Sequence, residues 1–145
     1  MRSLSVWVGM SLLLLTGLAR AEGAAEAIRG FGLVGTWSPD CAKDPVKEHA
    51  FSMTFSIPVA GPPTDTIVLS SPNNPATRYD WQITSAVRVA KDRIEVRSVF
   101  VGGEELVEPH RKIAPLPTVN ATIAQMGDKI LVGEQTSNIY EKCLN

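Results

Sequence analysis

The chain has 145 residues, of which 44% are hydrophobic and 20% charged, and its formal net charge is −1. This length and composition suit one domain with a single buried core. The scattered and nearly balanced charges argue against nucleic acid or an anionic membrane surface as a partner, because both select clustered basic residues.

The first 21 residues have the pattern of a secretory signal peptide. Arg2 supplies a short positive segment, residues 4–18 are apolar, and Ala19-Arg20-Ala21 is a small-residue cleavage motif. The apolar run is shorter than the roughly 20 residues that a membrane span needs. Cleavage after Ala21 leaves a domain of residues 22–145, with no membrane span. We therefore expect a periplasmic or secreted monomer.

Cys41 and Cys143 are the only cysteines, and in an exported protein such a pair usually forms a disulfide. The bond would join the two ends of the domain and close a loop of about 100 residues, worth up to about 4–5 kcal/mol in the chain-entropy model. Two free thiols are the alternative. Neither His49 nor His110 lies at a ligand spacing from a cysteine, so we expect no metal site and no cofactor.

The domain is expected to begin with a short helical turn. Residues 22–29 are rich in alanine and glutamate, which favour helix, and Gly30 and Gly32 follow them. Beyond Gly32 the pattern changes to the two-residue alternation of apolar and polar side chains that is typical of β-strands.

The clearest strand covers 49–57, where Phe51, Met53 and Phe55 fall on one face and serine or threonine on the other. One apolar and one polar face are typical of an antiparallel sheet. Gly102-Gly103 predicts a hairpin, and residues 70–75 have the composition of a loop. The expected strands cover residues 33–37, 49–57, 64–69, 79–90, 93–101, 104–113, 118–126, 129–135 and 138–143.

Eight or nine short strands without a long helix indicate an all-β sandwich or barrel. A disulfide between Cys41 and Cys143 favours the barrel, because it would bring the first strand next to the last. Closure into a barrel also removes the exposed sheet edges that invite aggregation.

Gly35-Thr36-Trp37, on the first strand after a helical turn, resembles the Gly-x-Trp signature of lipocalins and the wider calycin group. The resemblance implies that residues 22–145 form a single antiparallel barrel, which in that fold has eight strands and a tryptophan that closes its bottom. The alternation along this chain is consistent with eight or nine strands. It also implies a basic residue near the end of the last strand that packs across Trp37, for which Lys142 is the candidate. A cation over an indole face gains about 0.5–2 kcal/mol.

Two groups of exported bacterial proteins share more of the pattern. Leu-Val-Gly-Thr-Trp-Ser-x-Asp-Cys, at 33–41, with a basic residue and a cysteine near the end of the chain, is similar to small exported proteins of Gram-negative bacteria with no assigned activity. A Gly-x-Trp near the start of a small disulfide-bonded barrel also resembles the periplasmic metalloprotease inhibitors, which insert an N-terminal trunk into the protease. Residues 22–32 would be that trunk.

The apolar row formed by Phe51, Met53 and Phe55, together with Trp81, is the candidate ligand site. Plain core packing is the simpler interpretation of this row. The functional interpretation is an apolar cavity of a few hundred Å³ inside the barrel, since small barrels can hold one small ligand. Two serines on otherwise apolar faces, Ser85 and Ser98, are the polar groups that could orient such a ligand.

No catalytic pattern is found: the chain has no Gly-x-Ser-x-Gly elbow, phosphate loop or His-Glu-x-x-His. His49 beside Glu48, and His110 near Glu108, are explained as solvated surface residues. The sequence therefore predicts a barrel protein that is not an enzyme and that binds a small apolar ligand. The alternative is an inhibitor-like or interaction module that binds a protein partner through its N-terminal segment.

Overall fold

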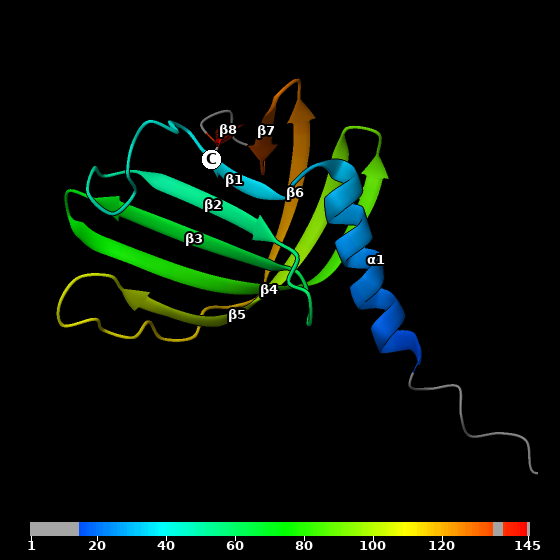
Figure 1. Ribbon diagram of the computed structural model, residues 1–145, viewed down its shortest axis with the longest axis horizontal. Coiled ribbons are helices and arrows are strands. Elements are labelled where there is room, and N and C mark those ends of the chain that lie inside the picture. Colours follow the sequence, from blue (N-terminus) through cyan, green and yellow to red (C-terminus); the bar gives the residue numbers. More distant parts are fainter. Residues whose placement is uncertain (1–14, 135–137, 145) are drawn as a thin grey trace, which may run out of the picture.

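The computed structural model describes residues 15–134 and 138–144, with only the backbone described for residues 15–22. One helix precedes eight antiparallel strands, which pair in sequence order and close into a barrel (Figure 1). The expected all-β antiparallel barrel is thus confirmed, with eight strands, and the architecture is compatible with a lipocalin-like fold. The elements are α1 (Leu15–Phe31), β1 (Gly35–Ser38), β2 (Phe51–Ser56), β3 (Thr64–Ser71), β4 (Asn74–Ala90), β5 (Arg93–Glu105), β6 (Val119–Met126), β7 (Lys129–Val132) and β8 (Ile139–Lys142).

The barrel closes between its first and last strands. Trp37 of β1 pairs with Lys142 of β8, and the backbone N–H of Cys143 donates to the carbonyl oxygen of Thr36 at 2.8 Å. Cys41 and Cys143 form the predicted disulfide just beyond this pairing, with their Cα atoms 5.3 Å apart. Hydrogen bonds and a covalent bond therefore hold the same seam.

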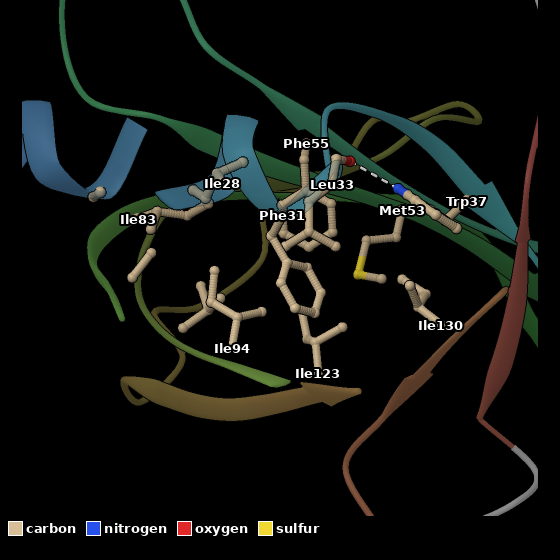
Figure 2. Close-up of a cluster of buried hydrophobic side chains, with 13 residues drawn as sticks. Ile28, Phe31, Leu33, Trp37, Met53, Phe55, Ile83, Ile94, Ile123 and Ile130 are labelled. Atoms are coloured by element: carbon tan, nitrogen blue, oxygen red, sulfur yellow. Dashed lines mark hydrogen bonds between the residues drawn. The ribbon is translucent and has the colours of Figure 1, made fainter. Parts of the chain in front are cut away.

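Helix α1 packs against β4 at one end of the barrel (Figure 1). Ala24, Ile28 and Phe31 are spaced four and three residues apart, so they share one helix face, and all three are buried. Figure 2 shows Phe31 pointing into the cluster of core side chains, toward Ile123. The helix thus contributes part of the barrel's core.

A Schellman motif ends α1. Gly32 has a φ of +81°, which glycine adopts without strain, and its N–H donates to Arg29 O at 3.0 Å. The N–H of Leu33 donates to Ile28 O at 3.1 Å, and both side chains are fully buried. The helix is longer than the turn expected at 22–29. Its first residues fall in the predicted signal peptide, most of which lies outside the described residues, so that peptide stays a prediction.

The hairpin predicted at Gly102-Gly103 is wrong. β5 continues through both glycines, which pair with Asp80 and Tyr79 of β4. A Cβ at position 103 would lie 3.0 Å from the carbonyl oxygen of Arg78, so the glycine permits close packing rather than a turn. The separate strand expected over 104–113 does not form: Glu104 and Glu105 are the last residues of β5, and beyond them Lys112 makes an isolated bridge back to Glu104.

β4 differs from the expected strand 79–90 in both length and register. It begins at Asn74, directly after a tight turn from β3, so only part of the expected loop 70–75 is a loop. Its pairing with β5 shifts between Ile83 and Ser85, a β-bulge that breaks the alternation of faces. As a result Ala86 is buried and Val87 is 54% exposed, the reverse of the simple pattern.

Candidate functional site: the interior of the barrel

Trp37 and Lys142 lie at the seam between β1 and β8. Trp37 is buried, and its Nε1–H donates to the carbonyl oxygen of Leu33 at 2.8 Å (Figure 2). The Lys142 ammonium lies 5.5 Å from the centroid of the Trp37 rings, and its Nζ donates to Gly32 O at 3.3 Å. This is a cation–π contact that connects the last strand, the first strand and the end of α1.

Gly35 is the residue that lets Lys142 reach Trp37. Its φ is +125°, and a Cβ there would lie 2.9 Å from Lys142 Cε. We expect Gly35→Ala to lower the free energy of unfolding by about 1–3 kcal/mol, because alanine is strained at this φ and displaces the lysine. Urea denaturation measures the change.

Gly30→Ala is the matched control for this substitution. Gly30 lies within α1, and nothing approaches within 4 Å of the position of its missing Cβ. Alanine there should raise the free energy of unfolding by up to about 1 kcal/mol, since it is the better helix former. Equal effects of the two substitutions would contradict the role given to Gly35.

Most of the barrel interior is filled by a single apolar cluster. Figure 2 shows side chains from α1 and from the strands converging on it, with Met53 directed toward Ile130 and Phe31 between Ile94 and Ile123. Core packing, the simpler interpretation of the apolar row, therefore accounts for much of the interior. Among the described residues, the interior space found beside this cluster is smaller than the expected few hundred Å³, because these large side chains, including those of α1, fill the barrel.

A smaller cavity remains beside the cluster, with a volume of about 120 Å³. Val119, at the start of β6, is 42% exposed and marks where its wall meets solvent. A dry, apolar cavity of about 150 Å³ is large enough for benzene or xenon. The lining residues are Met53, Phe55, Asp65, Ile67, Trp81, Val96, Ser98, Val119, Ala121, Ile123 and Val132.

Four of the six predicted ligand-binding residues line this cavity, namely Met53, Phe55, Trp81 and Ser98. Phe51 does not. It is only partly buried, and its ring stacks on Tyr140 with the centroids 5.2 Å apart.

Ser85 does not line the cavity either. The bulge in β4 places it in a groove on the outer surface, where α1 meets β4.

Asp65 is the one charged residue among the described residues of the cavity wall, and it was not predicted from the sequence. It sits on β3 between Phe55 of β2 and Trp81 of β4, its register partners, and it is 8% exposed. Burial among these apolar groups raises the pKa of its carboxyl from 3.8 to about 7, since the charged form loses its hydration. The available signal was the alternation in 64–69, which puts Asp65 on the same face as Ile67.

Two buried polar atoms in this region stand out. Within the described part of the chain, neither Asp65 Oδ1 nor Trp81 Nε1 has a hydrogen-bond partner. The Trp81 ring packs edge-on against Phe100, with the centroids 5.3 Å apart. Buried polar groups are nearly always paired in folded proteins, so two orphaned atoms on adjacent strands of one cavity call for an explanation.

Comparison with known proteins adds no family to this description. No family model, curated protein or solved structure matches the chain. The case for a site therefore depends on its geometry alone.

Over residues 15–134 and 138–144, no group of three potential metal ligands comes together, and no helix is long and apolar enough to span a membrane. His110 lies in the exposed segment after β5, with its Nδ1 3.1 Å from the carbonyl oxygen of Glu105 and its Nε2 3.4 Å from a carboxylate oxygen of Glu108. His49 is exposed, lies just after a turn, and has a φ of 40°. Neither histidine is among the residues that line the interior cavity.

Proposed function

We propose that this protein is an exported carrier or sensor that binds one small, largely apolar molecule in the cavity of its barrel, without catalysing a reaction. The observation that carries the proposal is the cavity of about 120 Å³ lined by residues of strands β2 to β7. Concave, mostly apolar sites with a few polar groups are the usual form of small-molecule sites.

The volume limits the ligand to about the size of one six-membered ring. Cavities of about 150 Å³ accept benzene, so a single ring suits this one whereas a long acyl chain or a haem does not. The Cys41–Cys143 disulfide supports an address in an oxidising compartment, such as the periplasm or the exterior of the cell.

The alternative, a protein-binding trunk at residues 22–32, is less well supported. Ala24, Ile28 and Phe31 bury their side chains in the barrel's core. A segment with this packing would have to leave the core before it could enter a protease, which exposes about three apolar side chains at roughly 1.5–3 kcal/mol for each large one.

Titration with toluene tests the proposed site. We expect toluene to perturb the methyl NMR resonances of Met53 and Ile123, which line the cavity, and to raise the melting temperature as its concentration increases. Ala121→Leu, which puts a larger side chain into the cavity wall, should weaken toluene binding by at least about tenfold.

Ala124→Leu is the control on the same strand. Ala124 is three residues further along β6, pairs with Arg93 and Leu131, and is absent from the cavity wall. It should leave toluene binding unchanged. If the two substitutions have equal effects, or if toluene perturbs no cavity resonance, the barrel is not the binding site.

A further inference from the structure

Two residues that line the cavity, Asp65 and Trp81, each keep one polar atom without a hydrogen-bond partner, and these atoms indicate which chemical group a ligand would carry. This inference rests on the proposed function, because it concerns the same cavity. Asp65 and Trp81 are direct cross-strand partners, and such residues have their Cβ atoms about 4.5–5.5 Å apart. Both line the cavity, and both keep one polar atom buried and unpaired among the residues that the structure places.

The two atoms have different requirements. The indole Nε1–H of Trp81 is a donor only, so it needs an acceptor. The carboxyl of Asp65 accepts when ionised, and it both donates and accepts when protonated. A group that satisfies both residues in either state must therefore be able to accept one hydrogen bond and donate another.

We propose that the ligand is a small alcohol or phenol whose hydroxyl group lies between Trp81 Nε1 and Asp65 Oδ1, with its hydrocarbon part against Met53 and Ile123. The hydroxyl oxygen accepts from the indole, and the hydroxyl hydrogen is donated to the carboxylate. Ser98, on β5, is buried and lines the cavity, so its hydroxyl is available as a further hydrogen-bond partner.

Other head groups match less well. An ammonium has three donors and no acceptor, so it leaves the indole unpaired. A carboxylate or phosphate would bring a second negative charge beside Asp65 in an apolar setting. A carbonyl group accepts from the indole but can pair with Asp65 only while that carboxyl is protonated. Among these four groups, the hydroxyl is the one that can pair with both residues above and below neutral pH.

The test compares phenol with toluene, which has a methyl group in place of the hydroxyl. Dissociation constants measured at pH 8 should be about tenfold to a hundredfold lower for phenol, since toluene leaves two buried polar atoms unpaired. In Trp81→Phe, which lacks the indole N–H, the ratio of the two constants should fall toward one. Benzaldehyde at pH 8 should bind more weakly than phenol.

The indole N–H resonances give a second readout that needs no substitution. Phenol should shift the Trp81 Nε1–H proton, whereas the Trp37 Nε1–H, already bonded to Leu33 O, should not move. Equal dissociation constants for phenol and toluene would show that the hydroxyl adds no affinity, as expected if a water already bonds to the two polar atoms. This result would overturn the hydroxyl assignment but would leave the proposed function in place. Failure of both compounds to bind would overturn both proposals.

Discussion

Asp65→Asn should make the protein more stable than the wild type at pH 8. The wild-type chain must bury a carboxylate at this pH, because burial raises the pKa of Asp65 only to about 7. The asparagine amide has nearly the same shape and carries no charge at any pH. The difference in the free energy of unfolding should therefore depend strongly on pH.

The way in which wild-type stability changes with pH follows from proton binding to Asp65 in the folded and unfolded chains. Below pH 3.8 the Asp65 carboxyl is protonated in both the folded and the unfolded chain, and its ionisation contributes nothing. Between pH 3.8 and about 7 the unfolded chain loses this proton while the folded chain keeps it, so stability falls as pH rises. About three pKa units correspond to about 4 kcal/mol, lost by pH 8 and restored in acid.

Urea denaturation of both proteins at pH 4 and pH 8 measures this effect, and the difference between them cancels the contributions of other groups. We expect similar stabilities at pH 4 and an advantage of up to about 4 kcal/mol for Asp65→Asn at pH 8. Asp128→Asn, in the exposed turn between β6 and β7, is the control and should keep the wild-type profile. Parallel profiles for all three proteins would show that Asp65 is not buried as described.

Removing the disulfide should lower the free energy of unfolding by a similar amount, because the unfolded chain gains conformational freedom. Cys41 and Cys143 are separated by 102 residues, so the bond constrains nearly the whole domain when it unfolds. We expect Cys41→Ser with Cys143→Ser to lower the free energy of unfolding by about 4–5 kcal/mol. Circular dichroism in urea, with an unmodified protein in its oxidised form as reference, measures the loss.

Two further results would show that the loss of stability comes from the unfolded chain and not from a change in the folded barrel. Cys41→Ser alone should cost as much as the double substitution, because either one removes the cross-link. The denaturant slope should also increase, since the unfolded chain becomes less compact and exposes more surface. The β1–β8 hydrogen bonds remain in the variant, so the folded spectrum should not change. A loss below about 1 kcal/mol would contradict the chain-entropy account.

The ends of the domain could be predicted from the sequence because each depends on local chemistry. The cysteine pair in a chain with an export pattern indicated one disulfide. The resemblance of Gly35-Thr36-Trp37 to the lipocalin signature implied that Lys142 packs across Trp37, and the structure has this contact where the first and last strands meet. Strand positions were also largely recovered, because alternation is visible whenever one face is buried.

The errors in the predicted strands arise where pairing with the neighbouring strand decides whether a residue lies in a turn or in a strand, and which face it occupies. Gly102-Gly103 looks like a turn, yet in the barrel it lies inside a long strand where a side chain would collide with Arg78 O. The bulge after Ile83 moves Ser85 from the inner face to the outer one, and nothing in the sequence marks it. Neither feature can be predicted without the partner strand.

The candidate site was partly predictable for a similar reason. Alternation placed Met53, Phe55 and Trp81 on the apolar faces of their strands, and the structure has them on the wall of the interior cavity. Asp65 was visible as a carboxylate on the face of Ile67, but its significance depends on being packed between Phe55 and Trp81. The volume of the cavity depends on how far Phe31 and the other core side chains fill the barrel, which is a property of packing in three dimensions.

The central claim is that the barrel holds a ring-sized molecule beside Asp65, and a crystal structure determined after equilibration with toluene tests it most directly. The account predicts density for one toluene molecule in contact with Met53, Trp81 and Ile123, inside the cavity of about 120 Å³. Side chains packed directly against one another at this position, with no density for toluene at saturating concentration, would contradict it.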